Sequence, residues 1–475
     1  MIVNKFGGTS VGSGERMINV AHIIQREQTD TDTTPVVIVS AMSGVTNALR
    51  QAARTAAGGD PTTFRTIRQE LQRRHQEAIA VCTADAVEAT NLAAEITALL
   101  DWLETLCQSI YTLGELTPRG LDAVSGLGER LSARLVAAAM RGAGMSAEAV
   151  EASELIVTDG VFGSASPLMD QTAAKSRARL HPLCEAGTVP VVTGFIGATE
   201  DGVLTTLGRG SSDYSATILG NCLQADEVWI WTDVNGVMTA DPRIVSNART
   251  LDTISYGEVA ELSFFGAKVL HPRTIQPVAE LNIPVRVLNS LEPDNPGTII
   301  CGEISSEPLI KGITAIRDLS IITVAGVGMQ GVPGVAGRVF SSVATSGTSI
   351  LMITQSSSEQ AICFVVRTDE TESALEHVRA ELELELMRGD LQRVDSQDNV
   401  SIIAIVGAGM LGHPGIASRV FGALAYDGIN ILSIAQGSSE YNLSLVVAEE
   451  HVDDSVRAIH RQFELGDPDA QERGI

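Results

Sequence analysis

The sequence predicts an α/β protein in which a mainly parallel sheet with flanking helices is followed by a small α/β unit that occurs twice. Up to about residue 300, short apolar runs that end in small or polar residues alternate with helical patterns. Such runs are typical of strands buried on both faces of a parallel sheet. Residues 319–366 then align without a gap onto residues 400–447, with half of the positions identical.

The elements of the first part are predicted in order along the chain. Residues 2–6 form a strand that leads through a glycine-rich turn into a helical pattern. Further buried strands are predicted at 36–40, 190–194 and 227–233, and their polar ends are expected at one edge of the sheet, where ligands bind. The segment 62–145 is predicted to be helical, because apolar residues recur there at three- and four-residue spacing: Leu92, Ile96, Leu99, Leu103, Leu106 and Ile110.

The duplicated part follows proline-rich turns at 292–297 and 305–308. Each copy reads as strand, turn, helix, strand, turn, strand and helix. The best-matched segments are Gly326–Gly334 with Gly407–Gly415 and Ile353–Glu359 with Ile434–Glu440. Both copies contain G-x-G-x-x-G after an apolar strand, as dinucleotide-binding turns do. We exclude a nicotinamide cofactor, because the next strands end without the carboxylate that holds the ribose and each unit is too short.

Composition excludes several classes of protein. The 475 residues include 33 basic and 58 acidic ones, a net charge of −25, which disfavours nucleic-acid and membrane-surface partners. The six scattered cysteines contain no C-x-x-C pair, which indicates reduced thiols rather than disulfides or a zinc site. No apolar run is long enough to span a membrane, and Met1 leads directly into a strand, so a cytoplasmic location is expected.

The opening turn is the first candidate site. Lys5 lies near the end of a strand, and Gly7 and Gly8 follow before a helical pattern begins. Glycines let backbone N–H groups approach an anion, and lysine places a compact positive charge against phosphate oxygens. The spacing of a P-loop is missing. On this stretch alone, a phosphate cradle and an ordinary turn with a solvent-exposed lysine remain equally open.

Other polar segments follow predicted strands or open predicted helices. Ser40 and Thr46 bracket a turn rich in hydroxyl groups that suits a small polar substrate, and Glu129 can hold an ammonium group. Arg209 stands among glycines and serines, where its planar fork suits a carboxylate or phosphate. Thr232 and Asp233 form the polar end of the strand predicted at 227–233.

Each of these segments also has a structural interpretation. Glu129 and Arg130 can be a solvated pair on a helix, His271 can be a structural hydrogen-bonding group, and Asp241 with Pro242 can form only a turn. The recurrence of glycine-rich, hydroxyl-rich or basic loops at successive strand ends favours a site.

Together the motifs resemble the signatures of aspartate kinases, members of the amino-acid kinase superfamily. The matching segments are Lys5–Gly12, Gly208–Ser215, Trp231–Gly236 and Gly266–Pro272. The duplicated tail is similar to the paired ACT regulatory domains of that family, so the resemblance covers nearly the whole chain. It implies a three-layer amino-acid kinase domain over 1–303 and two ferredoxin-like ACT domains over 309–396 and 397–475.

The resemblance implies that the γ-phosphoryl group of ATP, used with Mg²⁺, is transferred to the side-chain carboxylate of L-aspartate. A carboxylate is ionised at pH 7 and needs no general base, so the reaction requires positioning and positive charge. The implied catalytic residues are Lys5, Arg209 and Asp213. The implied aspartate-binding residues are Ser40, Thr46, Glu129, Phe195, Arg209 and Ser212. The implied nucleotide-binding residues are Lys5, Gly7, Gly8, Thr232, Asp233, Met238, Arg243, Lys268 and Val269.

The chain departs from the family pattern at two positions. Ser211 stands where the family commonly has glycine, and Met238 stands where it commonly has an aromatic residue. Ser211 is expected to be tolerated unless its backbone needs a positive φ. Met238 puts a contact to the nucleotide in doubt.

The duplicated tail resembles that of threonine-sensitive aspartate kinases. This implies feedback inhibition by L-threonine through Gln355 and Gln436, association as a homodimer or a dimer of dimers, and a product that leads to lysine, threonine and methionine. Two alternatives stay open: a kinase of the same superfamily with another acceptor, and a non-catalytic amino-acid sensor. No protein ligand for Mg²⁺ is assigned.

Overall fold

The chain forms two compact units. The computed structural model describes residues 1–208, 210–267, 270–302, 308–437 and 441–466. The first unit comprises residues 1–237, 252–256 and 270–304, and the second comprises 238–251, 257–269 and 305–475. Two stretches that precede the predicted boundary at residue 303 therefore pack with the C-terminal unit.

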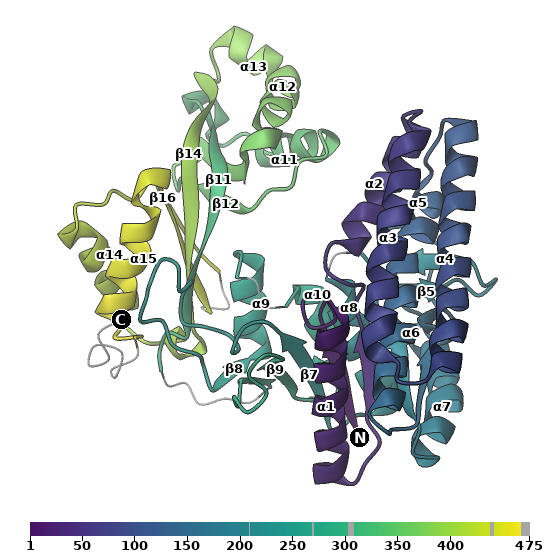
Figure 1. Ribbon diagram of the computed structural model, residues 1–475. Coiled ribbons are helices and arrows are strands. Elements are labelled where there is room, and N and C mark those ends of the chain that lie inside the picture. The colour runs from purple at the N-terminus through teal and green to yellow at the C-terminus, as the bar shows by residue number, and fades with distance from the viewer. Residues whose placement is uncertain (209, 268–269, 303–307, 438–440, 467–475) are drawn as a thin grey trace. The chain divides into compact units, whose positions relative to one another are not determined.

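An eight-stranded sheet forms the centre of the first unit (Figure 1). Its strand order is β3-β4-β2-β1-β7-β9-β10-β8, and every neighbouring pair is parallel except β9 with β10. The strands are β1 (Ile2–Phe6), β2 (Val36–Val39), β3 (Ala147–Val150), β4 (Val189–Thr193), β7 (Glu227–Thr232), β8 (Thr253–Ser255), β9 (Val285–Asn289) and β10 (Thr298–Cys301). The predicted strands correspond to β1, β2, β4 and β7, and the mainly parallel sheet is confirmed. A separate hairpin pairs β5 (Ile196–Ala198) with β6 (Leu204–Thr206).

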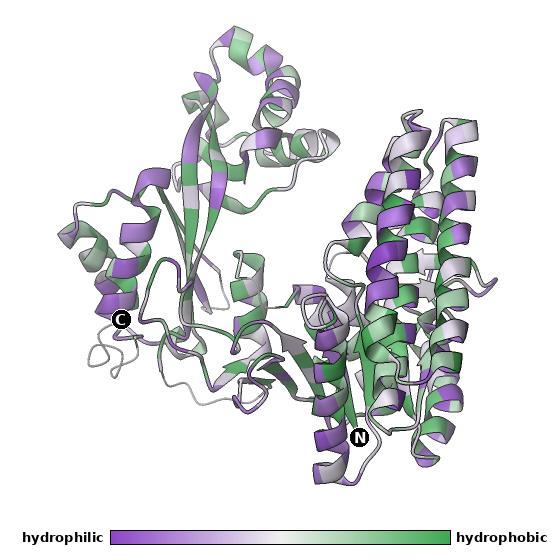
Figure 2. Ribbon diagram, in the orientation of Figure 1, coloured by the Kyte–Doolittle hydropathy of each residue, from purple (hydrophilic) through white to green (hydrophobic). Residues whose placement is uncertain are grey.

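Helices cover both faces of this sheet. They are α1 (Gly14–Thr31), α2 (Val45–Ala57), α3 (Pro61–Cys82), α4 (Ala86–Leu113), α5 (Pro118–Ser125), α6 (Leu127–Gly142), α7 (Met169–Glu185), α8 (Ser211–Leu223) and α10 (Pro272–Ala279). Val37 and Val39 join α1, α2 and α6 in one apolar cluster, whereas Ile38 between them is buried on the opposite face. The helices α7 and α10 each pack against α8, and α8 contacts β1, β2 and β7. Figure 2 shows these strands as hydrophobic and the outer faces of the long helices as hydrophilic.

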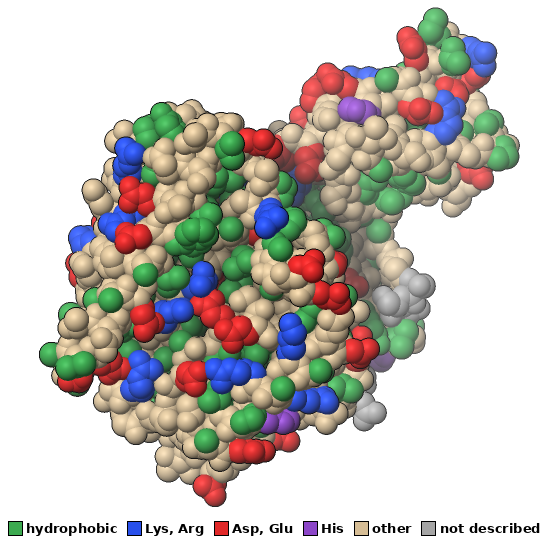
Figure 3. All heavy atoms as spheres, turned by 90° about the vertical axis from the view of Figure 1, so that its right-hand side faces the viewer, with side chains coloured by type: hydrophobic (Ala, Val, Ile, Leu, Met, Phe, Trp, Pro, Cys, Tyr) green, Lys and Arg blue, Asp and Glu red, His purple; other side chains and the backbone are tan. Residues whose placement is uncertain are grey.

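The outer faces of α3 and α4 carry charges of both signs. Figure 3 shows basic and acidic side chains interspersed on that side of the molecule. Arg68 pairs with Asp101, and Arg73 pairs with Glu70, each at 2.6 Å. Exposed pairs of this kind contribute only about 0–1 kcal/mol each to stability. None of the described helices is long and apolar enough to cross a membrane.

A buried carboxyl group connects α1 to the sheet. Glu27 is 4% exposed, and its Oε1 accepts a hydrogen bond from Asn4 Nδ2 at 3.1 Å. Asn4 Oδ1 in turn accepts one from the indole nitrogen of Trp231 at 2.8 Å. Burial raises the pKa of Glu27 from 4.5 to about 8, although the bond from Asn4 lowers it.

Glu27→Gln is expected to stabilise the protein increasingly as the pH rises from 5 to 8.5. Between pH 4.5 and 8 the folded state binds a proton that the unfolded state has released, so the free energy of unfolding of the wild type falls with pH. The variant, which is neutral at every pH, should gain on the order of 2–4 kcal/mol relative to the wild type at pH 8.5. Urea unfolding at several pH values measures this, with Asp30→Asn at an exposed position of α1 as the control. A difference between Glu27→Gln and wild type that stays constant with pH would contradict the prediction.

The second unit contains the duplicated part. The first copy consists of β11 (Gly312–Ala325), α11 (Val335–Thr345), β12 (Met352–Gln355), β13 (Ala361–Arg367) and α12 (Thr371–Glu381). The second consists of β14 (Arg393–Val406), α14 (Ile416–Tyr426), β15 (Ser433–Gln436), β16 (Asn442–Ala448) and α15 (Val452–Gln462). All five elements of the first copy recur 81 residues later, as from 312 to 393 and from 335 to 416. The predicted order of elements is confirmed. The unit also contains α13 (Glu383–Arg388) and most of α9 (Tyr256–Phe264).

The two long strands serve both copies. They lie side by side in an antiparallel sheet of order β12-β13-β11-β14-β16-β15. Residues 319–325 of β11 lie between β13 of the first copy and residues 393–400 of β14. Residues 312–316 of β11 pair with 402–406 of β14, which in turn pair with β16 of the second copy. The pairing shifts register near Asp318 and Asn399, which both have positive φ, at 58° and 57°. Each of the two strands therefore belongs to the sheets of both copies, and its pairing is irregular at the point where it passes from one copy to the other.

The glycines of the G-x-G-x-x-G turns have a packing role. A Cβ on Gly326 would lie 2.4 Å from the carbonyl oxygen of Asp390, and one on Gly407 would lie 2.3 Å from that of Leu309. Gly326 and Gly407 therefore allow close approach of a neighbouring backbone segment, whereas Gly331 and Gly412 have positive φ.

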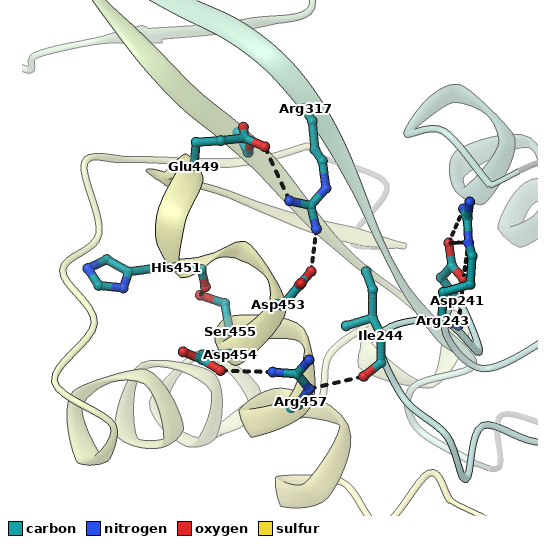
Figure 4. A network of polar contacts seen from close by, with 11 residues as sticks. Asp241, Arg243, Ile244, Arg317, Glu449, His451, Asp453, Asp454, Ser455 and Arg457 are labelled. Atoms are coloured by element: carbon teal, nitrogen blue, oxygen red, sulfur yellow. Dashed lines mark hydrogen bonds and ion pairs between the residues drawn. The ribbon is translucent and has the colours of Figure 1, made fainter.

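Ion pairs attach β11 to the second copy (Figure 4). Arg317 on β11 pairs with Glu449 at 3.2 Å and with Asp453 on α15. Arg457, one turn further along α15, pairs with Asp454 at 2.9 Å and donates to the carbonyl oxygen of Ile244 at 3.0 Å. These contacts tie β11, α15 and the stretch 238–251 together.

Candidate functional site

A cavity of about 380 Å³ lies where β1, β2 and β4 of the first unit end. Its lining residues are Lys5, Gly8, Ser40, Ala41, Met42, Ser43, Gly44, Thr46, Asn47, Arg50, Glu129, Phe195, Gly208, Gly210, Ser211, Ser212 and Asp213. The described substrate and catalytic residues predicted from the sequence all lie in this wall. The polar ends of separate strands therefore meet at one edge of the sheet, as parallel strands dictate.

Lys5 is largely buried at the end of β1 and forms an ion pair with Asp213. Its Nζ lies 2.6 Å from Asp213 Oδ1. Behind it, the Gly7 N–H donates to the carbonyl oxygen of Trp231, which ties the turn to β7. A Cβ on Gly8 would lie 2.9 Å from the carbonyl oxygen of Ala41, so only glycine allows this approach of the two loops. The interpretation of Lys5 as a solvent-exposed lysine is wrong.

Glu129 is buried on the first turn of α6, with 3% of its surface exposed. Its Oε1 accepts a hydrogen bond from the Ala41 N–H at 3.1 Å, and its Oε2 has no hydrogen-bond partner among the described residues. Burial raises the pKa of Glu129 from 4.5 to about 8, and the bond from Ala41 and the charges of Arg50 and Lys5 partly offset this. Arg130 instead pairs with Glu151 at 2.7 Å. The two neighbours are therefore not a solvated pair.

Two helices begin at the cavity. Gly44 precedes α2 and Gly210 precedes α8, both with positive φ and without a side-chain cap. Uncapped N-termini carry partial positive charge and attract anions. Ser211 is the first residue of α8 and does not have a positive φ, so its Cβ causes no backbone strain.

Phe195 lines the cavity with a φ of 69°, although it is not glycine. Its N–H donates to Ser215 Oγ at 3.0 Å, and its side chain is buried. An aromatic residue held in the left-handed region stores strain of about 1–3 kcal/mol, and such strain is concentrated at functional sites.

The predicted nucleotide residues are divided among several places. Thr232 and Asp233 lie at the end of β7, beside β1. Met238 and Arg243 belong to the second unit, where Arg243 pairs with Asp241 in a turn. Arg209, Lys268 and Val269 lie outside the described residues. His271 accepts a hydrogen bond from the Arg273 N–H and caps α10, which is a structural role.

The predicted effector residues Gln355 and Gln436 are exposed at the ends of β12 and β15. The two strands contact each other, since Thr354 Oγ1 donates to the carbonyl oxygen of Ile434 at 2.9 Å. The duplicated sequence thus places the two amides on neighbouring strands of one unit.

Asn47 and Arg50 line the cavity but were not predicted from the sequence. Both follow Thr46 on α2, and Arg50 lies one helical turn after it. Thr46 was predicted to bind substrate, and position 50 follows it by four residues on the same helix, so this spacing could have indicated Arg50.

Comparisons with known proteins identify the family of this chain. The profile of the Amino acid kinase family matches residues 1–289, and that of the ACT domain matches 322–382 and 403–463. The chain is 34% identical to aspartokinase 3, chloroplastic, of Arabidopsis thaliana, over 97% of this chain and 81% of that protein. The chain belongs to the aspartokinase group of the amino acid kinase family.

Other relatives of this family member are longer. It is 36% identical to bifunctional aspartokinase/homoserine dehydrogenase 1, chloroplastic, of Arabidopsis thaliana, over 98% of this chain and 51% of that protein. It is 37% identical to the bifunctional aspartokinase/homoserine dehydrogenase of Haemophilus influenzae, over 97% of this chain and 56% of that protein. The chain thus spans about half the length of these relatives.

Solved structures confirm the fold class. E. coli aspartokinase III in complex with aspartate and ADP has a TM-score of 0.81 at 30% identity, covering 97% of this chain and 99% of that one. The same enzyme in complex with lysine and aspartate has a TM-score of 0.80 at 30% identity, covering 98% and 99%.

Proposed function

We propose that this chain transfers the γ-phosphoryl group of Mg-ATP to the side-chain carboxylate of L-aspartate, giving 4-phospho-L-aspartate. The observation that carries the proposal is a cation and a buried carboxylate, Lys5 and Glu129, in the wall of one cavity. A phosphoryl group requires the first and an amino-acid ammonium group requires the second. The complex of aspartokinase III with aspartate and ADP supports this pairing of ligands.

Each residue has a proposed role in bringing two anions together. The ammonium group of aspartate binds Glu129 Oε2, which leaves the side-chain carboxylate directed to Lys5. Lys5, held by Asp213, stabilises the charge on the transferred phosphoryl group. The N-termini of α2 and α8 add positive potential, with Ser40, Thr46 and Ser212 as hydroxyl donors and Phe195 as a wall.

The remaining assignments also stay proposals. Arg209 binds a carboxylate of aspartate. ATP is bound by Gly7, Gly8, Thr232, Asp233, Met238, Arg243, Lys268 and Val269. Mg²⁺ enters on the phosphates of ATP and neutralises part of their charge. In the described part of the chain, no group of three or more His, Cys, Asp or Glu side chains is arranged to hold a metal ion.

Release of ADP from Mg-ATP with a panel of acceptor amino acids tests the proposal, with hydroxylamine trapping the acyl phosphate. We expect ADP release that depends on aspartate, with an equal yield of aspartyl hydroxamate. Turnover with another acceptor supports a different kinase of the superfamily. No turnover with any acceptor, in protein shown to be folded, supports a non-catalytic sensor.

We further propose that L-threonine inhibits through Gln355 and Gln436, in a chain that associates as a dimer or a dimer of dimers through the ACT domains. Two exposed apolar side chains on the neighbouring strands, Ile353 and Ile434, support a contact surface there. The product then serves the synthesis of lysine, threonine and methionine in the cytoplasm.

Saturating threonine is expected to weaken aspartate binding by about 5- to 150-fold, the usual range of coupling between sites. An amide can both donate to and accept from an amino acid, so Gln436→Ala should reduce this effect. The exposed Gln397 on β14 provides the control variant Gln397→Ala. Since aspartokinase III was solved with lysine, lysine is titrated in parallel. Inhibition by lysine alone, or an unchanged threonine response in Gln436→Ala, contradicts the assignment.

A further inference from the structure

Arg50 is a charged residue of the cavity wall that makes no hydrogen bond or ion pair with any other described residue. It lies on α2 one turn after Thr46, and it is half-buried. Its Nε is shielded from solvent, and among the described residues the side chain has no hydrogen bond or ion pair. A shielded guanidinium N–H without an acceptor is costly to maintain, so such a group at a cavity favours a bound anion.

Arg50 is also within electrostatic reach of Glu129. Burial raises the pKa of that carboxyl group, and the charge of Arg50 is among the effects that lower it again. Arg50 and Glu129 form no hydrogen bond or ion pair with each other, and among the described residues Nε of Arg50 and Oε2 of Glu129 each lack a hydrogen-bond partner. Both side chains belong to the wall of the same cavity.

An unpaired cation and an unpaired carboxylate at one cavity match the two charges of an α-amino acid. The ammonium and the α-carboxylate are attached to the same carbon, so a residue beside the ammonium site is suited to the α-carboxylate. The side-chain carboxylate is then left for Lys5, where phosphoryl transfer takes place under the proposed function.

We propose that Arg50 binds the α-carboxylate of the amino-acid substrate and so makes the enzyme specific for acceptors whose α-carboxylate is free. The proposal rests on the proposed function for its substrate. Arg50 would then be a second cation at the site, besides Arg209, which the sequence motifs indicated as a carboxylate-binding residue.

The test compares L-aspartate with its α-amide, L-isoasparagine, which keeps the ammonium group and the side-chain carboxylate but lacks the α-carboxylate charge. In Arg50→Gln, the KM for aspartate should rise about 10- to 100-fold, the usual worth of a charged hydrogen bond. The KM for ATP and the inhibition constant of isoasparagine should each change less than about 3-fold, because neither ligand uses that charge. Arg54→Gln removes the same charge from an exposed position of the same helix and serves as the control.

Arg50→Lys keeps the positive charge and should recover part of the aspartate affinity, while thermal unfolding checks that each variant is folded. An unchanged KM for aspartate in Arg50→Gln overturns the proposal. An equal loss for aspartate and isoasparagine also overturns it, because that result indicates a general distortion of the cavity. If the wild type shows no turnover, calorimetry measures the binding of aspartate and of isoasparagine without ATP and makes the same comparison. A failure of the proposed kinase activity is thereby distinguished from a failure of the Arg50 proposal.

Discussion

Lys5→Ala is expected to lower kcat by about 10²- to 10³-fold, the effect of removing one electrostatic stabiliser from a transition state. Lys5 is the cation at the end of β1 in the wall of the cavity, and its ion pair with Asp213 fixes its position before substrates bind. Without it, the charge of the transferred phosphoryl group faces Asp213 directly. The measurement is ADP release at saturating aspartate and ATP.

Two variants make this result specific. Lys175 is exposed on α7, and Lys175→Ala controls for loss of a positive charge from an already acidic chain. Lys5→Arg keeps a cation and should retain more activity than Lys5→Ala. A near-normal kcat for Lys5→Ala would remove Lys5 from the chemistry.

Glu129→Gln is expected to reduce kcat/KM for aspartate by about 100-fold at pH 8.5, since a buried charged partner of the substrate is lost. It should also change the pH profile. Because burial raises the pKa of Glu129 to about 8, the free wild type holds the protonated form below that pH, and only the carboxylate binds an ammonium group. Below about pH 8, the kcat/KM of the wild type should therefore decrease with falling pH, by up to tenfold per pH unit. The variant should be nearly independent of pH over the same range.

The rate profile from pH 5.5 to 8.5 tests this, with Glu115→Gln at an exposed position as the control. Equal slopes in wild type and Glu129→Gln would assign the pH dependence to another group. In Glu129→Gln the KM for ATP should stay near the wild-type value, which separates substrate binding from a general distortion of the site.

The sequence predicted much of the fold because its signals are local. An apolar run such as the one predicted at 36–40 is typical of a strand in a sheet covered on both faces. In the structure this run forms β2, and its apolar residues are buried. The duplication was visible as matched residues and recurred as matched elements. Of the strand ends predicted to meet, those of β1, β2 and β4 do meet at one cavity, with Lys5 and Ser40 in its wall. Thr232 and Asp233, at the end of β7, do not line it.

Features of the fold and of the site that depend on tertiary packing could not be predicted from the sequence. Nothing in the residues around Glu129 and Arg130 distinguishes a buried side chain from an exposed one, because adjacent positions on a helix face different neighbours. Arg50 carries no motif, and its place in the cavity follows from the direction in which α2 leaves the substrate turn. The association of 238–251 with the C-terminal unit depends on long-range contacts such as the Thr239 hydroxyl with His460, 221 residues apart.

The sharing of β11 and β14 has a consequence for how this chain can be divided. The predicted boundary between residues 396 and 397 falls inside β14, whose first residues close the sheet of the first copy and whose last residues begin the second. A cut at that point would leave each fragment with an open sheet edge and exposed apolar residues. Neither copy is therefore a module that can be expressed, exchanged or lost alone, and the pair is expected to unfold as a single cooperative unit. The two copies are therefore connected not only by side-chain packing but through the main chain of β11 and β14 itself.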